Sequence, residues 1–143
     1  DACYVSTYPA RDAAIRWISE TLIPELGRSR LDAAVIEVAD GLAHAETAAL
    51  LEADWLRRMI DGVLFCAQDA MGAKAGVDWL RERGHHIVAV SGLLTAAPLA
   101  MRETAELVEP PVVGLDGLSD RYVSRSLLAC EHGGAELRDA VAG

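Results

Sequence analysis

The sequence predicts an α/β fold, a parallel, doubly wound, Rossmann-like sheet of about four strands with helices on both faces. Short apolar runs rich in β-branched residues alternate with longer segments in which apolar residues recur at helical spacing. Gly, Pro and Asp-Gly signals separate these segments. Strands that are connected through helices pair in parallel by right-handed crossovers. The 143 residues are expected to form a single α/β domain, 1–143.

Composition restricts the function classes. Apolar residues make up 52% of the chain, which is enough for a folded core. The net charge of −9 has no basic stripe to offset it, which argues against a nucleic-acid partner. No apolar run reaches the length of a membrane span, so no membrane partner is expected. The cysteines Cys3, Cys66 and Cys130 show neither a disulfide framework nor a zinc spacing, which predicts a cytoplasmic protein.

The first half of the chain contains one strand between helices. A helix is predicted over 9–22, with Pro9 in its first turn. The run 33–38 is apolar and β-branched, as in a strand that is buried on both faces, and it ends at Asp40-Gly41. A helix follows over about 44–52, and a further one is expected after it, with Asp54 as its cap.

The second half continues the same alternation of strands and helices. Gly84 is a helix stop, and Pro98 suits the first turn of another helix. The expected strands are 63–67, 87–90 and a weaker edge strand 110–114, and the expected helices are 73–83, about 95–107 and 119–128.

Glu37 and Asp40 are the first candidates for a functional site. Glu37 is the only charged residue inside the run 33–38, and Asp40 stands where the expected strand ends. Ligands of open α/β sheets bind beyond the carboxyl ends of the strands, and carboxylates there suit a magnesium ion. We favour a functional role, because an unpaired buried acid is costly. The alternative is that Glu37 is a structural acid and Asp40 a turn residue.

The ends of the later strands carry further candidates. Asp69 lies in the loop after the expected strand 63–67, where it either lines the same cleft or caps the next helix. Ser91 and Gly92 follow the strand 87–90. Small residues there permit the close approach of a ligand, but they also make a tight turn.

The histidines and Cys66 are given structural roles. No pair of histidines has the i, i+4 spacing of a helical zinc site, so ordinary surface histidines are expected. Cys66 lies within an expected strand and is interpreted as a core residue. No Walker-type phosphate loop, Gly-x-Gly-x-x-Gly fingerprint or serine nucleophile elbow occurs in the sequence.

Four segments resemble a known group of proteins: VIEVADGL at 35–42, ETAALL at 46–51, QDAMGA at 68–73 and VSGLLTAAPL at 90–99. They are similar to segments of P-loop NTPase-like bacterial proteins that are related to dethiobiotin synthetase and to the P-loop family containing D-glutamate N-acyltransferase. The resemblance covers about residues 30–105. Its motifs are moderately specific.

The resemblance implies roles for individual residues. Glu37 would help to hold magnesium near the nucleotide phosphates, and Asp40-Gly41 would form the neighbouring turn. Ser91-Gly92 would lie near the nucleotide base. The family's phosphate-binding loop precedes this region, and the sequence does not contain it. The chain is therefore expected to be the C-terminal part of a larger P-loop-type domain, with the loop upstream, on another chain or lost. The chain alone is expected to bind a nucleotide poorly.

These inferences predict that the chain is part of a ligase- or transferase-like enzyme of small-molecule metabolism. The enzyme is expected to depend on magnesium and on ATP or another nucleotide. Its ligand is expected to be a small molecule. The alternative is a non-catalytic α/β module that binds a ligand or forms a homodimer and lacks the phosphate loop. The residues assigned to catalysis and to the metal are Glu37 and Asp40, and those assigned to cofactor binding are Gly41, Asp69, Ser91 and Gly92.

Overall fold

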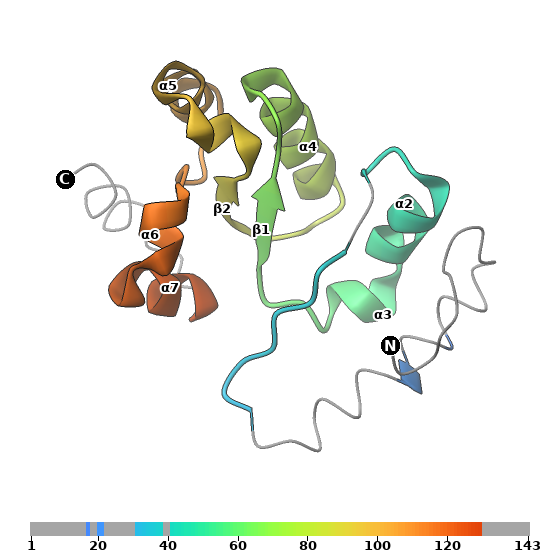
Figure 1. The fold of residues 1–143 in the computed structure, drawn as a ribbon. Helices are drawn as coiled ribbons and strands as arrows, with labels where there is room; N and C mark the ends of the chain where they lie inside the picture. The colour runs from blue at the N-terminus through green and yellow to red at the C-terminus, as the bar shows by residue number, and fades with distance from the viewer. Residues whose placement is uncertain (1–16, 18–19, 22–30, 39–40, 130–143) are drawn as a thin grey trace. The chain divides into compact units, whose positions relative to one another are not determined.

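The computed structural model of the chain describes residues 17, 20–21, 31–38 and 41–129 (Figure 1). The chain divides into two compact units, 1–59 and 60–143, and each unit is described by itself below. Most of the helix expected over 9–22 lies outside the described residues. Trp17, Glu20 and Thr21 are described and helical, and the Thr21 hydroxyl donates a hydrogen bond to the Trp17 carbonyl at 2.8 Å.

The strand expected over 33–38 is not formed. Residues 31–38 have no regular secondary structure, and all of them are exposed. Val35 is 86% exposed and Ile36 is 55% exposed, although both were expected to be buried. The prediction failed because β propensity describes how well a side chain fits a pleated, half-buried surface, and it does not supply the neighbouring strand.

Helices α2 (Ala45–Glu52) and α3 (Asp54–Arg57) follow in the unit 1–59. The helix expected over 44–52 is confirmed as α2. Leu51 of α2 and Leu56 of α3 are 6% exposed each. Asp54 was expected to cap the next helix, but it is the first residue of α3, and the capping position belongs to Ala53. From its place in the first turn, the Asp54 carboxylate pairs with Arg57.

The unit 60–143 is built on a parallel strand–helix–strand motif, β1 (Val63–Cys66), α4 (Ala70–Glu82) and β2 (Ile87–Ser91). Val63 pairs with Ile87 and Cys66 pairs with Ser91, so the strands run in the same direction. The α/β class and the parallel pairing are therefore confirmed. Helix α4 begins earlier than the expected range 73–83.

A third segment touches the sheet at one point. Val112 forms an isolated parallel bridge with Val90, in which the Val90 amide donates to the Pro111 carbonyl and the Val113 amide donates to the Val90 carbonyl. The edge strand expected over 110–114 is thus a single bridge, because the prolines at its start have no amide hydrogen to donate. In the described part of the chain the sheet has two strands, β1 and β2, rather than about four.

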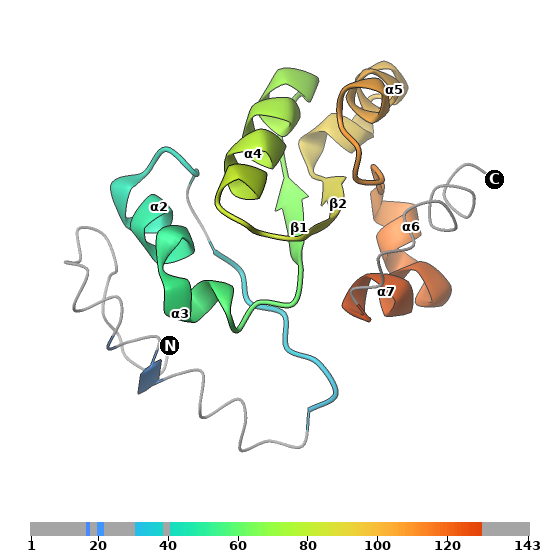
Figure 2. The same ribbon diagram turned by 180° about the vertical axis from the view of Figure 1, so that it is seen from behind.

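Short helical elements follow β2. The order is η1 (Leu93–Ala96, a 3₁₀-helix), α5 (Pro98–Leu107), α6 (Leu115–Ser119) and α7 (Arg121–Leu128). Helices α4 and α5 contact each other and lie side by side in both ribbon views (Figures 1 and 2). The last helix, expected over 119–128, is confirmed as α7, and Asp120 caps it by accepting hydrogen bonds from the amides of Tyr122 and Val123. The short helix α6 before it was not expected.

The core of this unit has two sides. Val77 and Leu80 of α4 are 1% exposed each. A separate buried cluster joins the sheet to α7 and consists of Ala89, Val113, Val123 and Leu127. Cys66 was predicted to be a core residue but is exposed, and Leu64, two residues earlier on β1, is 40% exposed. Alternate residues of a strand point to opposite faces, so these two side chains share the more open face of β1.

Gly76 allows α4 to pack closely on β1. A Cβ atom at this position would lie 2.2 Å from the ring of Phe65, which is shorter than any van der Waals contact. The absence of a side chain at Gly76 therefore sets the distance between the helix and the strand.

Gly76→Ala is predicted to lower the free energy of unfolding by about 1–3 kcal/mol, because the Phe65 ring must move out of its site. Gly72→Ala in the same helix is the matched control, since its Cβ would lie 3.4 Å from the nearest atom, an Asp69 side-chain oxygen. Urea unfolding of both variants is the measurement. A control variant that loses as much stability as Gly76→Ala would contradict the packing argument.

Candidate functional site

The loops that follow β1 and β2 meet at the carboxyl ends of the two strands. The Ala67 amide donates a hydrogen bond to the Ser91 carbonyl at 2.9 Å, and the Leu94 amide donates to the Ala67 carbonyl at 3.2 Å. Both polar groups of the Ala67 backbone are therefore bound by the segment that leaves β2. These hydrogen bonds join the two loops at the edge where ligands bind in parallel α/β sheets.

Gly92 makes this junction possible. Its φ of 102° and ψ of −162° belong to a backbone region that is almost restricted to glycine. A Cβ atom at Gly92 would lie 2.6 Å from the carbonyl oxygen and 2.7 Å from the amide nitrogen of Ala67. The close approach therefore requires glycine for two independent reasons, its backbone conformation and the space available.

Ser91 has a structural partner. The side chain is 2% exposed, and its hydroxyl donates a hydrogen bond to the Val113 carbonyl at 2.7 Å. The hydroxyl thus connects the end of β2 to the segment that carries the Val112 bridge. Of the two interpretations of the Ser91-Gly92 pair, the structure directly accounts for the tight turn.

A third segment approaches the same edge. The Thr95 hydroxyl donates to the Gly92 carbonyl at 2.8 Å, which stabilises the turn after β2. A Cβ atom at Gly114 would have the Thr95 Cβ as its nearest neighbour, at 3.9 Å. The residue that precedes α6 therefore lies beside the turn after β2. Sequence analysis did not identify Gly114, whose only signal is a small residue directly after an apolar run.

Asp69 caps α4. Its carboxylate accepts a hydrogen bond from the Gly72 amide at 2.7 Å, and this explains why the helix begins at Ala70 rather than near residue 73. The side chain is exposed and belongs to the loop after β1, as expected. Of the two roles considered for Asp69, its hydrogen bond shows the helix cap.

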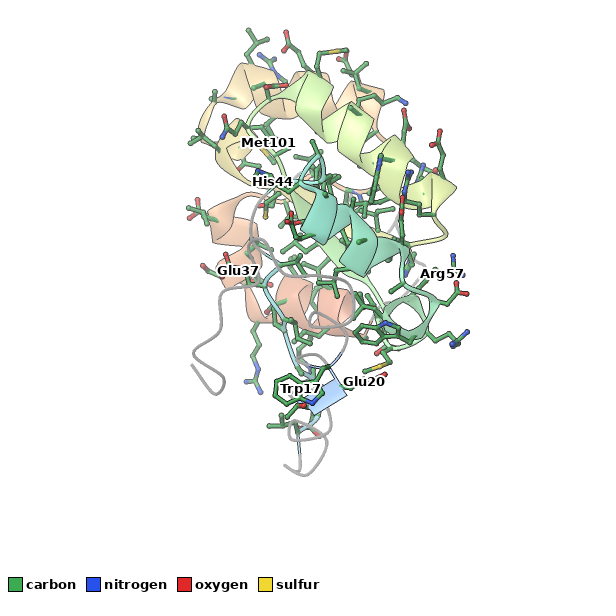
Figure 3. All side chains as sticks on the ribbon, turned by 90° about the vertical axis from the view of Figure 1, so that its right-hand side faces the viewer. Trp17, Glu20, Glu37, His44, Arg57 and Met101 are labelled. Atoms are coloured by element: carbon green, nitrogen blue, oxygen red, sulfur yellow. The ribbon has the colours of Figure 1, made fainter. Side chains whose placement is uncertain are left out.

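The remaining candidates belong to the unit 1–59. Glu37 is exposed and stands in the segment without regular secondary structure (Figure 3). Asp40 lies outside the described residues. Gly41 is exposed, and a Cβ there would meet no atom within 4 Å, so the described structure shows no close approach that requires glycine. In the unit 60–143, the structure places Ser91 and Gly92 against Ala67, two residues before Asp69.

In the described ranges, no group of three or more His, Cys, Asp and Glu side chains is arranged to hold a metal ion. His44 is exposed, as expected of a surface histidine, whereas His85 is 6% exposed, which corrects that interpretation for this residue. No described helix combines the length and the apolar character that crossing a membrane requires.

The chain was compared with protein-family models, with curated proteins and with solved structures, and none of the three comparisons found a match.

Gly92→Ala is predicted to lower the free energy of unfolding by roughly 2–4 kcal/mol, because it combines an unfavourable φ with overlap on the Ala67 backbone. Gly114→Ala is the control, since its φ of −78° suits any residue and its nearest contact is 3.9 Å away. Equal unfolding midpoints for the two variants in urea would show that the turn after β2 does not depend on Gly92.

Proposed function

We propose that this chain is part of an enzyme that depends on magnesium and a nucleotide and catalyses a ligase- or transferase-like step of small-molecule metabolism. The observation that carries the proposal is the junction of the loops after β1 and β2, where the Ala67 backbone is bound by Ser91 and Leu94. Parallel α/β units bind their ligands at this edge. The choice of magnesium and ATP, or another nucleotide, rests on the resemblance of residues 30–105 to P-loop NTPase-like proteins.

The proposal includes a larger sheet and a phosphate loop. We propose that β1, β2 and the bridge at Val112 belong to a Rossmann-like sheet of about four strands with helices on both faces. This chain would then be the C-terminal part of a P-loop-type domain. The phosphate-binding loop would come from an upstream segment or from another chain, because the sequence contains none.

Glu37 and Asp40 are proposed to position magnesium. The exposed Glu37 carboxylate is accessible to a ligand, and magnesium needs only one or two protein carboxylates when nucleotide phosphates complete its coordination. The described side chains on their own do not fit a resident metal site, since they contain no cluster of three ligands. We therefore assign no reaction step to the metal.

The residues at the strand ends are proposed to shape the ligand site through their backbone. The Ser91 hydroxyl donates to the Val113 carbonyl and the Asp69 carboxylate accepts from the Gly72 amide, so both side chains already have a role in the fold. Gly92 presents backbone without a side chain. In this proposal the loops exclude water and position the ligand, while phosphoryl chemistry proceeds by positioning and charge neutralisation.

The second candidate is a non-catalytic α/β module that binds a small molecule or forms a homodimer. The structural hydrogen bonds of Ser91 and Asp69 favour it, because both side chains have roles in the fold without any catalysis. Met59, at 47% exposure, is available to a dimer surface, whereas the Trp79 ring is covered by the Arg83 guanidinium at 3.7 Å. The net charge of −9 disfavours nucleic acid for either candidate, and we propose a cytoplasmic location for both.

Glu37→Gln is predicted to abolish magnesium-dependent nucleotide binding in the protein as its natural source makes it, while leaving the unfolding midpoint unchanged. The physical reason is that the amide keeps the shape of the side chain but removes the negative charge that a hard cation requires. Calorimetric titration with ATP, with and without magnesium, is the measurement.

Glu106→Gln on α5 is the matched control, because it removes one exposed carboxylate from a described helix. Unchanged ATP affinity in Glu37→Gln would rule out the assignment of Glu37. If the natural protein shows no nucleotide binding and a concentration-dependent dimer, the non-catalytic module is the correct candidate.

A further inference from the structure

We draw no further inference here: the strongest candidate, the open face of β1 on which Leu64 and Cys66 are exposed, is an unpartnered strand face, and nothing in the described part of the structure shows what covers it.

Discussion

The close approach of Gly92 to the Ala67 backbone is the constraint on which the carboxyl edge of the sheet depends. It places the turn after β2 directly against the loop after β1, where Ala67 exchanges hydrogen bonds with Ser91 and Leu94. From this turn, Ser91 reaches Val113 and Thr95 lies beside Gly114, so the third segment is positioned by the same contact. One glycine thereby organises the segments that border the proposed ligand site.

The sequence predicts those elements whose signals are local. β1 and β2 lie within one residue of their expected bounds, because short apolar runs between turn signals define both strands. Gly84 ends the α4 region with a φ of 78°, as a helix stop should. Asp69 and Asp120 show the limit of such signals. An Asp before an apolar run suits a cap, a turn and a ligand equally well, and only the hydrogen bond from Gly72 to Asp69 distinguishes them.

The features that the sequence does not predict depend on partners distant in the chain. The run 33–38 has the composition of a buried strand, yet Val35 is exposed, because composition cannot supply a neighbouring strand. Cys66 lies in a strand but is exposed, since the face of β1 that carries it is less covered than the face toward Gly76. The role of Ser91 depends on Val113, and that of Gly114 depends on Thr95. In each pair, helix α5 separates the two residues along the chain. The same argument holds for function. Candidate residues can be chosen from the sequence, but the sequence does not show which of their hydrogen-bonding groups already have a partner within the fold.

The central claim is that the ligand binds where the turn at Gly92 meets Ala67. The most direct test is a backbone amide NMR titration of the natural protein with magnesium and ATP. The account predicts that, within the unit 60–143, the largest shift changes fall on residues 67–72, 91–95 and 113–116, which border the carboxyl edge. Shift changes confined to the C-terminal end of α4 or to α7, or no shift changes at saturating nucleotide, would contradict the account.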